Sequence, residues 1–321
     1  MSQAVLYQAN PYTVDYTPAA ALSAGDVIQL GDGRAAVPSS DIAAGVLGAV
    51  STEGVFQVDK TTGVVLLDGG RVFWDHSANK ATFRAVQDRD FFIGTAVGDA
   101  ASAATTCYVN LNVDQRVAID IRSDGRAIPV GTAAVNAFGA LYANGVTPGL
   151  ALTATSEAQK IDLLSDAARA VSANGIAEYI VRLGANGSTS AVDINIGVAN
   201  GTNATDADSI TESVFFHIDG GALDILAESD DGTTEVAATD TTIDITAGSA
   251  ESNKFEFWID MRNPADIQLY INGVNVLPAS VFTLGAATGP LSLLVHVEKT
   301  TGTATAGPLY VDRGILRTAE Q

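Results

Sequence analysis

Carboxylate pairs are the first place to look for chemistry in this sequence, because it holds 37 Asp and Glu residues. Hydrolysis of a glycosidic bond needs two carboxyl groups about 5–9.5 Å apart. In the run KFEFWIDM (254–261), Glu256 and Asp260 fall on the same face of an expected strand. Their spacing of four residues puts them ~13 Å apart at the rise of a β-strand. That separation is too wide, and the triplet E-x-D-x-x-E does not occur, so we expect no glycosidase.

Motifs for other kinds of catalysis are also missing from the sequence. There is no G-x-S-x-G nucleophile turn, and the Gly-rich pieces lack the Lys-Ser/Thr pair of a phosphate-binding loop. The one cysteine, Cys107, lies in an expected strand without a histidine nearby in sequence, which favours a buried, inert thiol. We therefore predict that the chain is not an enzyme and that it uses no cofactor.

Metal ligation is the next chemistry that histidines and acids could support. His76, His217 and His296 stand far apart, and none has a His or Cys neighbour at ligand spacing. His217 and His296 fall in strand-like runs, which favours strand histidines with satisfied hydrogen bonds. The acidic segments 203–212 and 227–235 carry oxygen ligands that suit calcium, but neither matches the D-x-[DN]-x-[DN]-G loop. We predict solvated turns there and no metal site.

Aromatic side chains offer one route to ligand binding. Trp258, Tyr270 and Tyr310 could stack on sugar rings if their strands presented an open sheet face. The alternative is that these rings belong to the core, where aromatic residues bury large apolar areas.

The charge of the chain excludes whole classes of partner. Its 17 Lys and Arg against 37 Asp and Glu give a net charge of −20, which disfavours nucleic acid and anionic membranes. Residues 1–113 hold 6 basic and 11 acidic residues, and the remainder holds 11 and 26. Most of the negative charge therefore lies in the second part of the chain. The start, MSQAVLYQANPY, lacks a basic segment followed by an apolar run, so no secretion signal is expected.

Hydrophobic patterning indicates an all-β protein. Short β-rich runs recur every 8–15 residues between Gly, Asn, Asp and Thr, which is typical of sandwiches and barrels. Residues 155–170 have helical composition, but we favour strands on either side of a polar turn at 150–165. Asn272-Gly273 between alternating runs predicts a type I′ hairpin.

The division of the chain follows from where these runs begin and end. A strand closes near Asn112, and a second series of strands starts at Val135. We expect a first domain at 1–113, a linker at 114–134 and a second domain at 135–321. The alternative is that the segment 114–134 supplies a strand to either domain.

The first 112 residues resemble the cement, or head-decoration, proteins of tailed-phage capsids. The resemblance is carried by AGDVI (24–28), DIAAGVLGAVSTEGVFQV (41–58), GRVFWD (70–75), IGTAV (93–97) and VNLN (109–112). It implies a small β-rich domain, β-barrel-like or β-tulip-like, that assembles as a homotrimer near local threefold positions. Such a domain binds the outer surface of the major capsid protein lattice and stabilises the head.

The N-terminal segment 3–18 suits such binding because it is extended, rich in Val and Tyr, and almost uncharged. Its candidate capsid contacts are Tyr7, Pro11, Tyr12 and Tyr16. The alternative is that the segment is simply the first strand of its own sheet.

The second domain resembles, more loosely, concanavalin-like and laminin-G-like jelly-roll sandwiches, through FEFWIDMRNPADIQLYINGVNV (255–276) and PLYVDRGILR (308–317). Fold does not fix function. We therefore expect a virion structural protein, made in the host cytoplasm and located on the outer capsid surface, with its acidic sandwich facing outward. The alternative is a lectin-like module that binds host-surface glycans from the virion.

Overall fold

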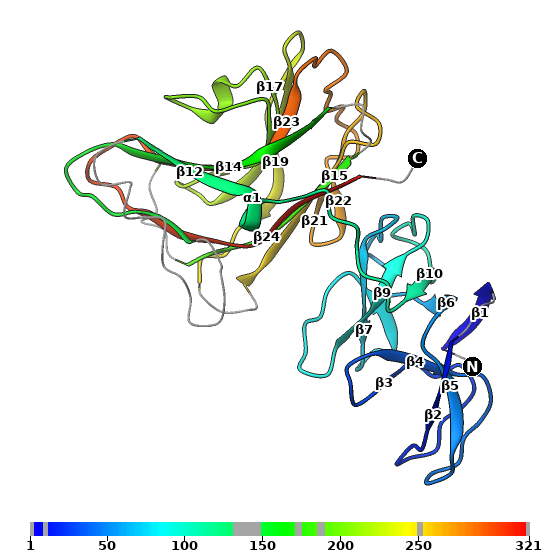
Figure 1. The fold of residues 1–321 in the computed structure, drawn as a ribbon. Helices are drawn as coiled ribbons and strands as arrows, with labels where there is room; N and C mark the ends of the chain where they lie inside the picture. The colour runs from blue at the N-terminus through cyan, green and yellow to red at the C-terminus, as the bar shows by residue number, and fades with distance from the viewer. Residues whose placement is uncertain are drawn as a thin grey trace. The chain divides into compact units, whose positions relative to one another are not determined.

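A computed structural model describes residues 3–8, 12–130, 149–170, 175–184, 190–248 and 253–318. The chain divides into two compact units, unit 1 (Met1–Arg116) and unit 2 (Val117–Gln321), which are considered separately here (Figure 1). Almost all regular structure in both units is β-strand, so the expected all-β class is confirmed. Within the described residues, no helix is long and apolar enough to cross a membrane.

Unit 1 contains a six-stranded antiparallel sheet in the order β1-β6-β10-β9-β7-β8 and a four-stranded sheet in the order β2-β5-β4-β3. Its strands are β1 (Ala4–Gln8), β2 (Thr13–Tyr16), β3 (Ile28–Gln29), β4 (Ala35–Pro38), β5 (Gly48–Ser51), β6 (Val55–Asp59), β7 (Arg71–Asp75), β8 (Lys80–Thr82), β9 (Phe91–Ala96) and β10 (Thr106–Leu111).

The larger sheet of unit 1 forms because its strands alternate between buried and partly exposed residues. In β6, β7 and β10 every second side chain is buried, which places Phe56, Trp74 and Val109 in one core. Burying a side chain of this size stabilises a fold by roughly 1.5–3 kcal/mol. Cys107 is a buried member of the same core, and burial raises the pKa of its thiol to about 12, as expected for an inert cysteine.

Unit 2 is a sandwich of two seven-stranded antiparallel sheets (Figure 1). The first runs β11-β24-β15-β20-β21-β22, with β13 also paired to β24, and the second runs β12-β14-β23-β16-β17-β18-β19. The elements are β11 (Ile119–Asp120), α1 (Ile121–Asp124), β12 (Gly125–Val130), β13 (Gly149–Leu152), β14 (Gln159–Ala170), β15 (Gly175–Leu183), β16 (Val192–Ala199), η3 (Ala207–Ser209), β17 (Glu212–Asp219), β18 (Asp224–Asp231), β19 (Glu235–Asp244), β20 (Phe255–Asp260), β21 (Gln268–Ile271), β22 (Val274–Val276), β23 (Pro290–Lys299) and β24 (Ala306–Thr318).

Both sheets of unit 2 contribute one face to a single large core. Phe257 and Ile259 of β20 meet Ile196 of β16 and Phe216 of β17 there, and the Phe216 and Phe257 rings lie 4.7 Å apart. The hairpin predicted at Asn272-Gly273 joins β21 to β22, and both turn residues have positive φ, as a type I′ turn requires.

Two parts of the sequence fold in ways that bear on the expected organisation. Residues 159–170, which have helical composition, form β14, so the preference for strand is confirmed. Most of the segment assigned to a linker lies in unit 2 instead, because β11 pairs with β24 and β12 pairs with β14. Backbone pairing removes these residues from the linker; 131–134 lie outside the described residues.

Candidate functional site

Several buried ionisable groups gather on the outer face of the β12–β19 sheet of unit 2. Strand pairing sets Asp162 of β14 opposite His296 of β23, His296 opposite Asn195 of β16, and Asn195 opposite His217 of β17. These residues alternate with core residues, so they point away from the sandwich core. They are nevertheless mostly buried.

A loop that contains η3 covers part of this outer face. Ala207 and Ile210 pack on Phe215 and Leu294, which form a small second core with Leu164 and Ala199. This packing holds Asp206 and Asp208 over the sheet, where they meet side chains of β16 and β17.

His296 and Asp162 form a fully buried ion pair. Each side chain is 1% exposed, and Nδ1 of His296 lies 2.6 Å from Oδ1 of Asp162. Nε2 of His296 points toward Oε2 of Glu298 at 3.4 Å, and Nζ of Lys160 lies 3.2 Å from the second oxygen of Asp162. Burial alone would lower the pKa of His296, but Asp162 and Glu298 outweigh it and raise the pKa.

His217 is surrounded by three carboxylates. Its Nε2 lies 2.8 Å from Asp193, and its Nδ1 lies 3.5 Å from Asp208 and 3.6 Å from Glu228. Burial would lower the pKa of His217, but hydrogen bonds and charge from Asp193 and Glu228 overcome it and raise the pKa to about 11. The amide nitrogen of Asn195 donates to Asp208 at 2.7 Å and to Glu228 at 3.1 Å. Asn195 therefore holds these two carboxylates in place beside His217.

Glu228 differs from its neighbours because it is held away from water. Burial is the main reason that its pKa rises to about 7; the charge of His217 lowers the pKa and that of Asp208 raises it. Glu228 and Asp208 also line a pocket of about 130 Å³ beside β18 and β19, together with Asp230 and Glu235. This pocket therefore suits a small cationic or strongly hydrogen-bonding group.

Two groups of residues around Asp193 bring atoms that could ligate a metal close together. Asp193, Asp208 and His217 form one, and Asp193, Asp206 and Glu298 form the other; in each, one ligand atom per residue lies within 4.8 Å of the others. Sequence reasoning missed both groups, although it considered the segment that holds Asp206 and Asp208 as a source of calcium ligands.

The pH dependence of stability tests this account of His217. The imidazolium form is favoured in the folded state, with a pKa of about 11 against 6.5 for the ordinary side chain. Its stabilising contribution is complete below pH 6.5 and is lost as the pH rises toward 11. In buffers without divalent cations, we expect the free energy of unfolding of unit 2 to fall between these pH values. Urea unfolding at a series of pH values measures this free energy. In the His217→Gln variant, the free energy of unfolding should depend less steeply on pH. An equally steep dependence in the variant would contradict the raised pKa of His217.

The residues considered for glycosidase chemistry have other roles in the structure. Oε1 of Glu256 accepts a hydrogen bond from Nε1 of Trp258 at 2.9 Å. Asp260 pairs with Arg262 at 2.6 Å. Both carboxylates thus contact side chains of their own strand or of the turn that follows it.

The aromatic residues considered for sugar stacking are buried. Trp258, Tyr270 and Tyr310 are 6%, 7% and 5% exposed. The Trp258 and Tyr270 rings pack against each other at 5.8 Å, and the Arg182 guanidinium lies 5.3 Å from the Tyr310 ring. Because their neighbours Phe257, Leu269 and Leu309 belong to the sandwich core, these three rings lie on the opposite face of their sheet, where they are buried all the same.

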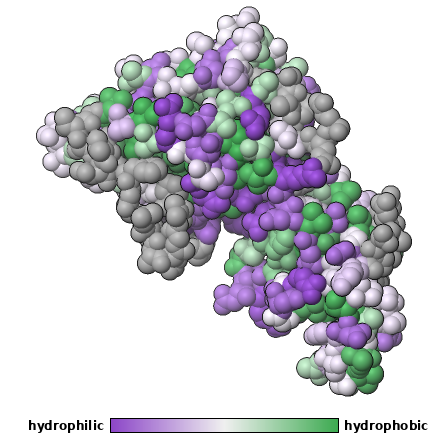
Figure 2. Space-filling view, in the orientation of Figure 1, coloured by the Kyte–Doolittle hydropathy of each residue, from purple (hydrophilic) through white to green (hydrophobic). Residues whose placement is uncertain are grey.

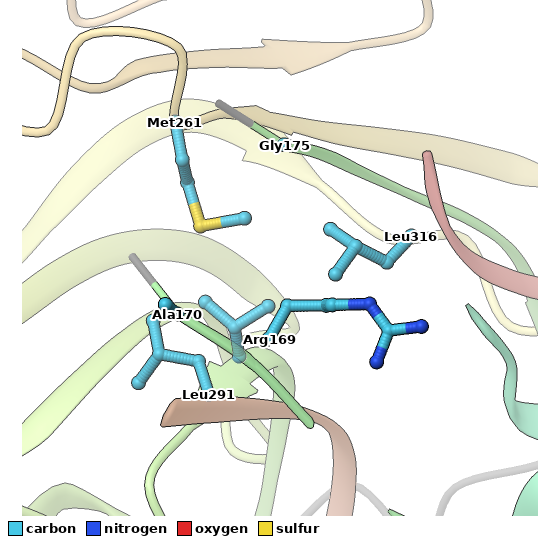
Figure 3. A pocket seen from close by; sticks show the side chains of 7 residues that line it. Arg169, Ala170, Gly175, Met261, Leu291 and Leu316 are labelled. Atoms are coloured by element: carbon cyan, nitrogen blue, oxygen red, sulfur yellow. The ribbon is translucent and has the colours of Figure 1, made fainter. Parts of the chain in front are cut away.

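A small apolar pocket lies between the two sheets of unit 2 (Figure 3). Met261, Leu291 and Leu316 line it, with Arg169 beside them. Its volume of about 10 Å³ accommodates no more than one water molecule, so it is not a ligand site.

The N-terminal segment of unit 1 contributes strands to both sheets of that unit. Tyr7 lies in β1, which pairs with β6 at the edge of the larger sheet, and Tyr16 lies in β2, which pairs with β5. Tyr12 is 61% exposed and Tyr16 is half-buried, whereas Pro11 lies outside the described residues. The described parts of the segment thus pair with strands of unit 1, and the Tyr12 ring is exposed.

Unit 1 also carries an exposed apolar loop tip, made by residues 19–21 and 43–47. The two loops are joined by a hydrogen bond from the Gly45 amide to the Pro18 carbonyl. Val46 is 52% exposed and Leu47 is 65% exposed. Figure 2 shows pale and green surface at this end of unit 1.

Comparison with known families concerns unit 1. Residues 7–111 match the family model of phage cement proteins. This range takes in β2 to β10 and the last two residues of β1, so the cement domain expected from the sequence is supported over nearly all of unit 1. No curated protein sequence matches the chain.

Solved structures resemble the fold only distantly. The carbohydrate recognition domain of Emp47p is 11% identical, with a TM-score of 0.43, over 61% of this chain and 89% of that one. The corresponding domain of Emp46p is 8% identical, with a TM-score of 0.42, over 62% and 90%. LamAcat from Zobellia galactanivorans is 14% identical, with a TM-score of 0.38, over 54% and 78%. Similarity this low says nothing about what the present chain binds.

Proposed function

We propose that this protein is a capsid decoration protein, in which unit 1 binds the outer surface of the major capsid protein lattice of a phage head. The observation that carries the proposal is the match of residues 7–111 to phage cement proteins. The distribution of charge agrees with this arrangement, because most of the negative charge lies outside residues 1–113. Unit 2 is then displayed outward, where an acidic surface disfavours nonspecific contact with nucleic acid.

Assembly as a homotrimer at local threefold positions is part of the same proposal. A trimer presents the same binding surface three times, so weak individual contacts add up when all three copies engage the lattice. The protein then strengthens the head by joining neighbouring capsid subunits.

The contact surface that we propose on unit 1 combines backbone and side-chain features. Strand β1 is at the edge of its sheet and suits strand addition by a capsid segment. Tyr7 lies in β1, Tyr12 is exposed, and Tyr16 lies in β2 at the edge of the smaller sheet. Pro11, which lies outside the described residues, is proposed as a contact from the sequence alone. The apolar loop tip offers a second uncharged contact.

Cryo-EM of heads that lack the protein, before and after adding the purified chain, tests the proposal. Added density on the outer surface at threefold positions is expected, and light scattering should give a trimer in solution. Heads that show no added density at saturating protein would refute the decoration role, whereas bound monomers would refute only the trimer.

We expect Tyr12→Ala to weaken binding to heads by about tenfold or more, because an exposed tyrosine that becomes buried in an interface is a frequent hot spot. Cosedimentation with heads measures the affinity. Val86→Ala removes a comparably exposed apolar side chain of unit 1, and its affinity should stay unchanged. Equal affinities for the two variants would remove Tyr12 from the contact surface.

A further inference from the structure

Two segments of unit 1, residues 15–29 and 35–49, fold in the same way and are related by an approximate local twofold axis. Residues twenty positions apart make the same contacts in the two segments. The amides of Leu22 and Ile42 donate to each other's carbonyl oxygens, both at 2.9 Å. The matching strand pairs are Gln29 with Ala35 and Ala49 with Asp15, and Ile28 with Ala36 and Gly48 with Tyr16. The smaller sheet of unit 1 therefore contains an internal repeat.

Each segment contains a turn built on a glycine, the first turn at residues 23–27 and the second turn at residues 43–47. Gly25 and Gly45 have positive φ values of 84° and 71°, a conformation that favours glycine. In both turns the glycine amide donates at 2.8 Å to the carbonyl of a proline in the other segment. The next amide donates at 3.1 Å to the carbonyl three residues earlier, again in both turns. Since these backbone contacts match, the two turns differ mainly in their side chains.

The side chains of the first turn serve the fold of unit 1. Val27 is 7% exposed and belongs to the core of the larger sheet. Its amide donates to Oε1 of Gln3, the residue before β1, at 3.3 Å. Carboxylate oxygens of Asp26 and Asp41 accept hydrogen bonds from two further amides of this turn, at 2.7 and 2.9 Å. Hydrogen bonds and packing within unit 1 therefore account for the residue types of this turn.

The second turn has apolar residues at the equivalent positions. Val46 stands where the first turn has Asp26, and it is 52% exposed. Leu47 stands where the first turn has the buried Val27, and it is 65% exposed. Ala21 stands at the position of the second capping acid. Exposed apolar side chains that gather in one place indicate a contact with another molecule.

We propose that the second turn places Val46 and Leu47 in an uncharged apolar pocket of the major capsid protein. This inference rests on the proposed capsid role and assigns the side chains that anchor unit 1. The charge of the chain supports an apolar partner surface. Residues 16–25 and 42–52 contain no Asp, Glu, Lys or Arg, although the net charge of the chain is −20.

The position of the second turn favours the capsid protein over a second copy of this chain. The Gly45 amide bonds to the carbonyl of Pro18, so the turn is continuous with the N-terminal segment 3–18, which we propose as a capsid contact. A second copy offers no vacant equivalent of the surface that receives Val27, because its own first turn fills that surface.

Cosedimentation of the full-length protein with phage heads tests the anchor. Leu47→Ser should lower the affinity for heads by about tenfold or more, because a small polar side chain replaces a large apolar one in the contact. Val86→Ser is the matched control, since Val86 is 73% exposed on unit 1 and lies outside the repeat. Its affinity for heads should stay unchanged.

The two turns also serve as controls for each other in thermal unfolding. Val27→Ser, at the equivalent position of the first turn, should lower the melting temperature of unit 1, because it places a hydroxyl in the core. Leu47→Ser should leave the melting temperature unchanged, because Leu47 is mostly exposed in the free protein.

Photo-crosslinking identifies the molecule that the second turn contacts. Ala44→Cys places a thiol in this exposed turn and keeps Leu47, and the native Cys107 is buried, so benzophenone maleimide should label position 44. On heads, irradiation should join the labelled protein to the major capsid protein.

The possible results separate this inference from the decoration role. The inference alone is overturned if Leu47→Ser binds heads as well as the original protein does while Tyr12→Ala binds weakly. It is also overturned if Leu47→Ser lowers the melting temperature of unit 1 as much as Val27→Ser does, or if the crosslinks join two copies of this chain. If the original protein does not bind heads, the decoration role and this inference fail together.

Discussion

Replacing Asp162 with alanine is expected to lower the free energy of unfolding of unit 2 by about 3–5 kcal/mol. The carboxylate is 1% exposed and serves two buried cations, His296 at 2.6 Å and Lys160 at 3.2 Å. Removing one partner of a buried ion pair leaves the other charge without compensation in a medium that solvates it poorly, which accounts for a cost of this size. The loss exceeds that of an ordinary surface substitution severalfold.

Chemical denaturation followed by tryptophan fluorescence measures this loss. The two tryptophans lie in different units, so in a Trp74→Phe background the signal of Trp258 reports on unit 2 alone. Asp166→Ala is the matched control on the same strand, because Asp166 is 62% exposed and forms only a surface ion pair with Arg126. That variant should change stability by less than about 1 kcal/mol. If both variants lost a similar free energy of unfolding, the buried ion pair would contribute no more to stability than the surface ion pair.

Lys60→Met should destabilise unit 1 by roughly 3 kcal/mol, since three partly buried carbonyls lose their donor at once. Lys60 is fully buried at the end of β6, and its ammonium group donates to the carbonyl oxygens of Thr61 at 2.9 Å, Val64 at 2.5 Å and Ala104 at 3.4 Å. Methionine fills a similar volume but cannot donate. Burial lowers the pKa of Lys60, yet the three carbonyls hold the ammonium and tie the 61–64 turn to the loop before β10.

The same denaturation experiment in a Trp258→Phe background, followed through Trp74, reports on unit 1. Lys80→Met on β8 is the control, because Lys80 is only half-buried. Its effect should be well under that of Lys60→Met. A stability of the Lys60→Met variant equal to that of the original protein would mean that water replaces the ammonium at no cost.

The covering of the outer sheet face explains why sequence reasoning found the strands and missed the ionic cluster. LLVHV at 293–297 predicts a strand and places His296 between apolar neighbours, and the structure agrees. Alternation of apolar and polar residues along a strand shows which sheet face is in the core, but it does not show whether the opposite face is also covered. Here η3 and its loop cover it, so groups that would be solvated on an open sheet become a buried network.

The prediction of a linker at 114–134 failed for a similar reason, because the sequence does not show which strands pair. Residues 119–130 contain short apolar stretches between charged residues, which suits a linker as well as an edge strand. These residues form strands because β11 pairs with β24 and β12 pairs with β14, and both partners come later in the chain. Local composition carries no information on pairing over such distances.

By itself the sequence determined the all-β class, the Asn272-Gly273 hairpin and the resemblance of the first 112 residues to cement proteins, because alternation, turn residues and ordered motifs are local properties. Only the tertiary structure decided that Asp193, Asp206 and Glu298 meet, that Asp162 neutralises His296, and that Trp258, Tyr270 and Tyr310 are buried. Each of these depends on which strands pair, in which register, and on what covers the sheet. Those choices are made by long-range packing of apolar faces, which brings together residues with no relation in the chain.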